Sequence, residues 1–349
     1  MKENNRIIDR NELILITGSN GFIGTRVVDA LLRSGFSNLR CLVRPSGNLA
    51  DLQAVLDAAP GARVEIMPGN LLSREDCANA VKGVAVILHL AAGIEKTFPG
   101  SFMNSVVATR NLLDAVVDGG SLRRFVNVSS FAVYSNWNLR SGALLDEECE
   151  TESRPVERAE PYAFAKLKQD QLVIEYSQKF GIPYVILRPG AVYGPRARQL
   201  TGRVGIDTFG IFLHLGGSNQ IPLTYVDNCA QAIVLAGITS GVDGEVFNVV
   251  DDNLPSSRKF LRMYKKHGKS FRSIYVPYWL FYCLSWIWEN YSKRSKGQLP
   301  PVFNRRRCAI YWKGNKYSNN KLKERVGWRP AVPFAEASKR YFEFVRRAG

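Results

Sequence analysis

A short apolar run that leads into three evenly spaced glycines constrains the fold more than any other feature of this sequence. Leu13–Thr17 (LILIT) has the composition of a buried β-strand, and Gly18, Gly21 and Gly24 follow it in the spacing G-x-x-G-x-x-G. Residues 22–33 then place apolar side chains at helical spacing. Glycines let a turn pass close to a diphosphate, and the start of the following helix offers free N–H groups to it. The segment therefore predicts a dinucleotide-binding strand–turn–helix unit.

The alternation of strands and helices continues to about residue 190. Further strands are expected at 39–43, 64–67, 84–90, 124–129 and 184–188, and further helices at 49–59, 74–81, 102–117 and 162–179. The run VAVILHL at 84–90 is almost continuously apolar, which is typical of a strand covered on both faces. The pattern predicts the α/β class, with a Rossmann-like doubly wound parallel sheet and helices on both faces.

The pattern changes after Pro189, where glycine, proline and basic residues separate shorter elements. We expect residues 1–190 to form an NAD(P)-binding Rossmann domain, to which 224–252 return. Residues 191–223 and 253–349 are expected to form a smaller, interleaved substrate-binding domain.

The net charge of +16 predicts attraction to an anionic partner: a phosphorylated cofactor, a nucleotide-linked substrate, an acidic membrane or nucleic acid. A solvated basic surface is the alternative. No nucleic-acid-binding motif accompanies the charge, so nucleic acid is not expected. The three histidines are dispersed, and we expect no metal site. Six dispersed cysteines, with no signal-peptide pattern in the first residues, predict a cytoplasmic protein with reduced thiols.

Two segments carry residues suited to acid–base chemistry. Ser129 and Ser130 stand at the end of the strand expected at 124–129, and Tyr162 and Lys166 are four positions apart in an expected helix. Residues at that spacing lie on one helix face, so the phenol and the ammonium can lie close to the same point in space. A free phenol has a pKa of about 10, and a nearby cation favours the phenolate. Tyr162 is thus the expected acid–base group, with Lys166 beside it, and Ser129 and Ser130 are the hydroxyls available at the strand end.

These segments, in this order, resemble the extended short-chain dehydrogenases/reductases, the NAD-dependent epimerase/dehydratase-like enzymes. TGSNGFIG at 17–24, Y-x-x-x-K at 162–166, HLAAG at 89–93 and RPGAVYGP at 188–195 carry the resemblance, which runs from about residue 13 to about 342. VRP at 43–45 and the run to the C-terminus resemble the 3β-hydroxysteroid-dehydrogenase and dihydroflavonol-reductase branch. The resemblance implies that Ser130, Tyr162 and Lys166 are catalytic. It also implies a homodimer built through the helices at 102–117 and 162–179.

The resemblance also implies a set of cofactor-binding residues in the glycine turn, at the strand ends and beside the tyrosine. They are Gly18, Asn20, Gly21, Phe22, Ile23, Gly24, Arg44, Asn70, Leu71, Ala91, Ala92, Gly93, Tyr162, Lys166, Pro189, Gly190 and Val192. Arg44 stands where NAD-preferring members carry an acidic residue, and a guanidinium can pair with a 2′-phosphate. NADP(H) is therefore favoured, while stacking of Arg44 on adenine would tolerate NAD(H). Asn70 replaces an aspartate of the family and keeps a carbonyl acceptor.

The favoured function is NAD(P)-dependent oxidation of a secondary alcohol or reduction of a ketone. A nucleotide-sugar or lipid-linked-sugar epimerase is the alternative, and a non-catalytic dinucleotide sensor is a third reading. Dehydratases of the family carry Asp-Glu after the catalytic Ser or Thr, whereas Phe131 and Ala132 stand there, so dehydration is not expected. Ser105 replaces the asparagine of the family's N-V-x-G-T helix motif.

The substrate side is defined only in outline. The aromatic-rich stretch 274–288 lies between basic residues and predicts either a packed helix, which we favour, or a peripheral membrane contact. Arg305–Arg307 predicts a grip on a diphosphate, or a solvated basic turn. The expected partner is a small-molecule substrate. In some of these alternatives the substrate is linked to a nucleotide or to a lipid.

Overall fold

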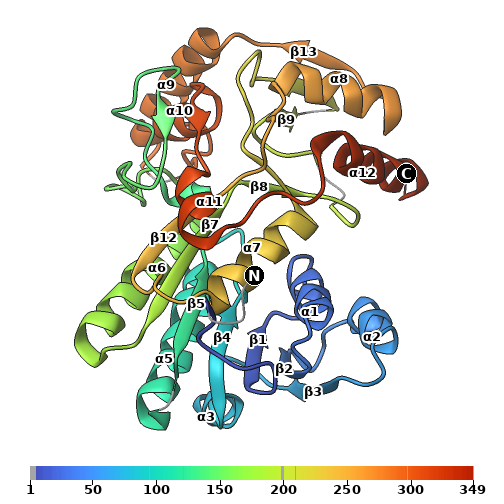
Figure 1. Ribbon diagram of the computed structural model, residues 1–349. Helices are drawn as coiled ribbons and strands as arrows, with labels where there is room; N and C mark the ends of the chain where they lie inside the picture. The colour runs from blue at the N-terminus through green and yellow to red at the C-terminus, as the bar shows by residue number, and fades with distance from the viewer. Residues whose placement is uncertain are drawn as a thin grey trace.

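A seven-stranded parallel sheet forms the centre of the molecule (Figure 1). The computed structural model describes residues 5–93, 95–120, 122–197, 200–208, 210–296 and 298–348. Across the sheet the order is β12 (Glu245–Val249), β7 (Tyr184–Pro189), β5 (Arg124–Val128), β4 (Val84–His89), β1 (Leu13–Thr17), β2 (Asn38–Val43) and β3 (Arg63–Pro68). The strand order reverses between β1 and β4, which is where doubly wound folds bind ligands. The predicted Rossmann-like class is confirmed.

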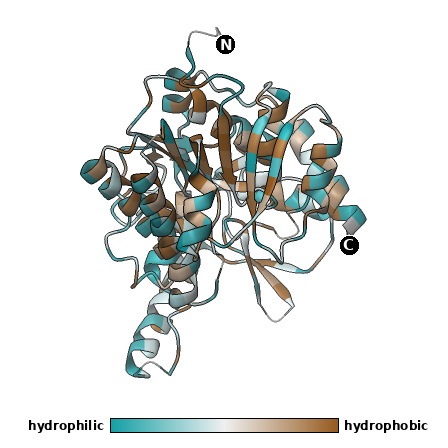
Figure 2. Ribbon diagram, turned by 90° about the horizontal axis from the view of Figure 1, so that it is seen from below, coloured by the Kyte–Doolittle hydropathy of each residue, from teal (hydrophilic) through white to brown (hydrophobic). Residues whose placement is uncertain are grey.

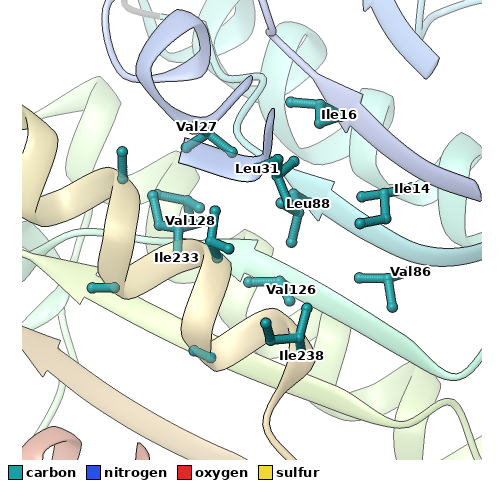
Figure 3. Close-up of a cluster of buried hydrophobic side chains, with 14 of the residues drawn as sticks. Ile14, Ile16, Val27, Leu31, Val86, Leu88, Val126, Val128, Ile233 and Ile238 are labelled. Carbon is teal, nitrogen blue, oxygen red and sulfur yellow. The ribbon is translucent and has the colours of Figure 1, made fainter. Parts of the chain in front are cut away.

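Helices cover both faces of this sheet, as its apolar strands require. On one face lie α1 (Gly24–Arg33), α2 (Ala50–Asp57) and α7 (Val226–Ile238); on the other lie α3 (Arg74–Val81), α5 (Ala108–Gly119) and α6 (Pro161–Phe180). Figure 3 shows Val27 and Leu31 of α1 and Ile233 of α7 packed over strand residues on the first face. In Figure 2 the central strands are mostly brown and the outer helices carry teal, so the apolar side chains concentrate in the sheet.

The helix expected at 102–117 differs from the observed one. The helical segment starts earlier, at α4 (Phe98–Ser101), because the Thr97 hydroxyl accepts a hydrogen bond from the Gly100 N–H at 3.3 Å and caps it. A π-helical turn, η2 (Phe102–Val107), follows and leads into α5. Such turns often occur at functional sites.

A second lobe stands above the carboxyl ends of the strands (Figure 1). It contains a small sheet of β13 (Ser273–Tyr275), β10 (Ile211–His214) and β9 (Gly205–Thr208), with α8 (Ser257–His267), α9 (Tyr278–Arg294), α10 (Arg305–Trp312) and α12 (Phe334–Ala348). The other strands that the structure describes form two short pairs. These are β8 (Ala191–Tyr193) with β11 (Leu223–Tyr225), and β6 (Leu144–Leu145) with β14 (Lys316–Tyr317). None of the described helices has the length and apolar composition needed to cross a bilayer.

Two segments return from this lobe to the main sheet. One is β12, with α7 before it, which pairs with β7 at the edge of the sheet. The other is α11 (Asn320–Val326), which the sequence had assigned to the substrate lobe. Leu322, Val326 and the fully buried Trp328 instead pack into the hydrophobic core between the main sheet and helices α1, α2 and α7.

Candidate active site

The glycine turn fits against the segment after β4 so closely that side chains are excluded. Gly18 has φ +70°, and a Cβ there would lie 3.1 Å from the backbone nitrogen of Ala91. A Cβ on Gly24 would lie 2.0 Å from the carbonyl oxygen of Gly18. The Gly21 N–H closes the turn with a 3.0 Å hydrogen bond to that same carbonyl. Glycine is therefore required by the geometry, and α1 begins at Gly24, behind the turn.

A cavity of about 430 Å³ opens beside the turn. Its walls come from the turn itself, the end of β2, and the segments after β3 and β4. The predicted cofactor residues that line it are Gly18, Asn20, Gly21, Arg44, Asn70, Leu71, Ala91 and Ala92. No Asp or Glu is among the described residues of the lining, and Arg44 is exposed at it. The cavity can accept the adenosine and phosphate part of a dinucleotide.

Two of the predicted cofactor residues already have other partners. The Asn70 side-chain oxygen accepts a hydrogen bond from the Leu72 N–H at 3.0 Å and so caps its own loop. The Gly93 N–H donates to the buried Ser105 hydroxyl at 3.0 Å, and Gly93 lines none of the cavities at the site. Ser105, which replaces the family's asparagine, thus anchors the segment after β4.

A second cavity of about 240 Å³ continues from the turn towards Tyr162. The other predicted residues meet here: Phe22, Ile23, Gly24, Ser130, Tyr162, Lys166, Pro189, Gly190 and Val192 line it, together with Ser129. They come from the ends of β1, β5 and β7 and the start of α6, which parallel strands bring to one edge of the sheet. The cavity is mainly apolar and can enclose a nicotinamide ring.

Lys166 lies beneath this cavity with its ammonium almost out of water. Its side chain donates to the Val128 carbonyl at 2.7 Å. Burial lowers the pKa of Lys166 to about 8, and the Asp170 carboxylate one turn further along α6 opposes that shift. Asp170 is itself buried and is held by the Asn127 amide at 2.9 Å and the Arg188 guanidinium at 3.3 Å. Sequence reasoning missed Asp170, although its i,i+4 spacing from Lys166 was a usable signal.

Tyr162 and Ser130 face each other at the mouth of the cavity. Burial raises the pKa of the Tyr162 phenol above its ordinary value, and hydrogen bonding to Ser130 opposes that shift. The Ser130 hydroxyl oxygen accepts a hydrogen bond from the Ala132 N–H at 3.1 Å. Its proton is therefore directed away from that contact and can be donated to the phenol or to a substrate oxygen.

His89 is a packed residue at the end of β4. Its ring nitrogens contact the hydroxyls of Thr17 at 2.8 Å and Thr109 at 2.9 Å. Burial first, and then the nearby Lys166 charge, lower the pKa of His89 to about 3. A neutral His89 thus links β1, β4 and α5 behind the cofactor cavity.

A third cavity of about 240 Å³ adjoins the tyrosine from the side of the second lobe. It shares Ser130, Tyr162 and Gly190 with the cavity below it. Arg203 and Arg307 line its far side, and the Arg203 guanidinium lies 5.1 Å from the ring centre of Tyr311. The junction of the two cavities is where a bound substrate would meet a nicotinamide.

Of the three arginines predicted to grip a diphosphate, only Arg307 lines this third cavity. Arg305 and Arg306 line a separate one and pair with Glu289 at 3.1 Å and Glu152 at 3.0 Å. Successive helical residues point in different directions, which a run of three arginines does not reveal. Arg203 was missed because residues 191–208 carry no periodic pattern.

Fold and site together define a dinucleotide-binding α/β protein with a Ser–Tyr–Lys group at the carboxyl edge of its parallel sheet. The chain belongs to the NAD dependent epimerase/dehydratase family, whose family model matches residues 14–249. It is an extended short-chain dehydrogenase/reductase, as its motifs predicted.

The relatives of this chain include proteins named as sterol dehydrogenases, as UDP-glucose epimerases and as trifunctional enzymes with UDP-glucose 4,6-dehydratase activity. The mouse sterol-4-alpha-carboxylate 3-dehydrogenase, decarboxylating, is 23% identical over 95% of this chain and 91% of its own length. The uncharacterized UDP-glucose epimerase YtcB of Bacillus subtilis is 29% identical over 68% of this chain and 76% of its own. Among solved structures, UDP-glucuronic acid 4-epimerase from Bacillus cereus, in complex with UDP-glucuronic acid and NAD, superposes with a TM-score of 0.71. It is 22% identical, covering 97% of this chain and 100% of that one.

Proposed function

We propose that this protein is an NAD(P)-dependent oxidoreductase that interconverts a secondary alcohol and a ketone, with Tyr162 as the acid–base group. One observation carries the proposal: Tyr162 and Ser130 line both the cavity beside the glycine turn and the cavity of the second lobe. A proton donor at that junction can reach a substrate oxygen from one side while the reacting carbon faces a nicotinamide on the other. The similarity to sterol dehydrogenases supports this reading.

Each residue of the group has a distinct task in this proposal. The Ser130 hydroxyl donates to the substrate oxygen, and Tyr162 takes the proton from an alcohol or returns it to a ketone. The Lys166 ammonium, which donates a hydrogen bond to the Val128 carbonyl, would favour the phenolate and would hold a nicotinamide ribose. A bound nicotinamide supplies the hydride acceptor or donor. The apolar cavity around the group excludes water from the transfer.

The proposed cofactor is NADP(H). The exposed Arg44 guanidinium at the adenosine cavity, and the absence of acidic residues among the described residues of its lining, both favour a 2′-phosphate. NAD(H) is the alternative, in line with the family description and with related structures that contain NAD.

A nucleotide-sugar or lipid-linked-sugar epimerase is the second candidate. Arg203 and Arg307 in the cavity of the second lobe favour an anionic substrate, and they fit a diphosphate. The likeness to a UDP-glucose epimerase points the same way. Dehydration is disfavoured, because Phe131 and Ala132 line that cavity where acid and base would be needed. A non-catalytic sensor is disfavoured, because it would not need both Tyr162 and Lys166.

Two further parts of the proposal concern the molecule as a whole. A homodimer through α5 and α6 is supported by exposed apolar side chains on and beside these helices: Phe102, Met103 and Phe180. Sedimentation velocity at micromolar protein tests the homodimer.

A cytoplasmic location is supported by six cysteines with free thiols.

Two measurements separate the candidates. Mass spectrometry of the nucleotide retained on purification comes first: tightly held NAD favours the epimerase, and exchangeable NADP(H) favours net oxidoreduction. A panel of sterols and nucleotide sugars with NADPH then identifies the substrate class.

The catalytic assignment is tested by Tyr162→Phe. Turnover should fall by about a hundredfold or more, while the dinucleotide Kd stays within about twofold, because the variant loses the hydroxyl that moves the proton but keeps the ring that lines the cofactor cavity. Tyr176→Phe, on the same helix but outside the cavities of the site, is the matched control and should retain most of the turnover. Full turnover in Tyr162→Phe would refute the assignment.

A further inference from the structure

Helix α9 buries one face and leaves a large apolar face in water. Phe281 and Ser285 are buried, with the Phe281 ring 5.2 Å from that of Trp312 on α10. The opposite face exposes large apolar and aromatic side chains: Trp279 (66%), Leu280, Leu284, Trp286 (50%), Ile287 (57%) and Tyr291 (60%). Their spacing of three and four residues places them along one side of the helix. We call these six residues the α9 face. A contiguous exposed patch of this kind marks an interaction surface.

Both ends of the α9 face are positively charged. Residues 257–307 contain 13 lysines and arginines but only one acidic residue, Glu289. That carboxylate is already paired with Lys293 at 2.9 Å and Arg305 at 3.1 Å. Arg272 before the helix, and Arg294 and Lys296 at its end, are exposed. Arg294 follows Ile287 and Tyr291 at helical spacing and so extends the same face.

We propose that the α9 face docks on an anionic lipid surface. Tryptophan and tyrosine with an apolar body and a polar tip favour the headgroup region of a bilayer, and flanking lysines and arginines attract anionic headgroups. The helix lies along the surface, because its other face is packed on α10 by Phe281. A second copy of the chain fits less well: a two-fold contact through this face would bring the basic residues of one copy (Arg272, Arg294 and Lys296) close to those of the other.

This docking places the catalytic region next to the lipid. α10, on which α9 packs, contributes Arg307, Tyr311 and Trp312 to the cavity beside Tyr162. The substrate cavity is thus one helix away from the bilayer. That proximity suits a lipid-linked substrate, an extension that rests on the proposed function, whereas lipid binding itself does not.

Vesicle flotation of the full chain tests the proposal. The vesicles contain phosphatidylcholine alone, or phosphatidylcholine with about one quarter phosphatidylglycerol. We expect binding to the anionic vesicles, weakened by salt, with a blue shift of tryptophan emission. The double variant Trp286→Ser/Ile287→Ser should lower the partition coefficient at least about tenfold. Arg294→Gln/Lys296→Gln should lower it about fivefold per charge.

A matched control removes equally exposed apolar side chains elsewhere. Val156→Ser/Leu144→Ser, from positions 65% and 49% exposed, should bind as the wild type does. Thermal unfolding and dinucleotide binding must match the wild type in all variants. Absence of vesicle binding by the wild type, or equal binding by the α9-face variant, would overturn the proposal. So would a wild-type dimer that the α9-face variant converts to a monomer in sedimentation velocity without lipid, because a second copy would then cover the face. A loss of turnover in Tyr162→Phe has no bearing on these outcomes.

Discussion

Burial is the largest influence on the titrating groups of the site. It lowers the pKa of Lys166 to about 8 and raises that of Tyr162, so each group in isolation is shifted towards its neutral form. The Asp170 carboxylate opposes the shift at Lys166 but adds to the one at Tyr162. In the proposed function, a phenolate at Tyr162 would therefore depend on the positive charges of Lys166 and of an oxidised nicotinamide. Proton transfer at this site should follow cofactor binding.

Replacing Arg44 tests whether this one residue makes the protein prefer NADP(H) to NAD(H). In Arg44→Ala, the Kd for NADP⁺ should rise about 10- to 100-fold while that for NAD⁺ changes little, since only the former has a 2′-phosphate to lose a charged hydrogen bond. Calorimetric titration with both nucleotides measures this. Arg33→Ala, another exposed arginine of the same lobe, is the control. Equal losses for both nucleotides would mean that Arg44 stacks on adenine.

His89 makes the stability depend on pH. Its pKa is about 3 when folded and about 6.5 when unfolded, so the unfolded state binds the extra proton between these values. Stability is therefore lost as the pH falls below about 6.5, by about 2 kcal/mol between pH 7 and pH 5. His89→Gln lacks this titration, and urea unfolding at several pH values should show a shallower loss. Identical slopes in wild type and His89→Gln would contradict the assignment.

At the scale of elements, the glycine turn joins β1 to α1 by close backbone contact. Gly24→Ala should lower dinucleotide affinity at least about tenfold and stability by about 1–3 kcal/mol, because its Cβ would lie 2.0 Å from the Gly18 carbonyl oxygen. Dinucleotide titration and urea unfolding check both effects. Gly61→Ala is the control, since a Cβ there meets nothing within 4 Å. Unchanged binding in Gly24→Ala would show that the turn can open without cost.

Elements followed from the sequence wherever an apolar pattern was strong. β1 and α3 were expected at their observed bounds, and β4 within one residue. The π-helical turn η2 was not expected. It carries Ser105, whose hydroxyl accepts a hydrogen bond from the Gly93 N–H. The intrinsic helix propensity of these residues does not predict that contact.

At the scale of the whole molecule, one buried ion cluster fastens the second lobe to the first. Glu160, just before α6, pairs with the buried Arg158 and, at 3.3 Å, with Arg307 of α10. Glu160→Gln should lower the free energy of unfolding by about 3–5 kcal/mol, because the Arg158 charge would remain buried without its partner. Urea unfolding measures the loss. Glu157→Gln, an exposed partner of Arg154 and Arg306, should cost less than about 1 kcal/mol. Equal effects would show that the cluster does not join the lobes.

The sequence by itself determined the fold class, and it predicted most of the residues that line the cavities beside the glycine turn. Strand periodicity, the spacing of Gly18, Gly21 and Gly24, and the Tyr162–Lys166 pair are local features, and parallel strands bring their ends to one edge without further information. Only the tertiary structure decided the substrate side. Arg203 and Arg307 come from segments about a hundred residues apart, and no local sequence pattern predicts that both line one cavity. Equally, only packing decided that α9 turns Phe281 inward and Trp286 outward, because an aromatic run is apolar on every side until a neighbour covers one of them.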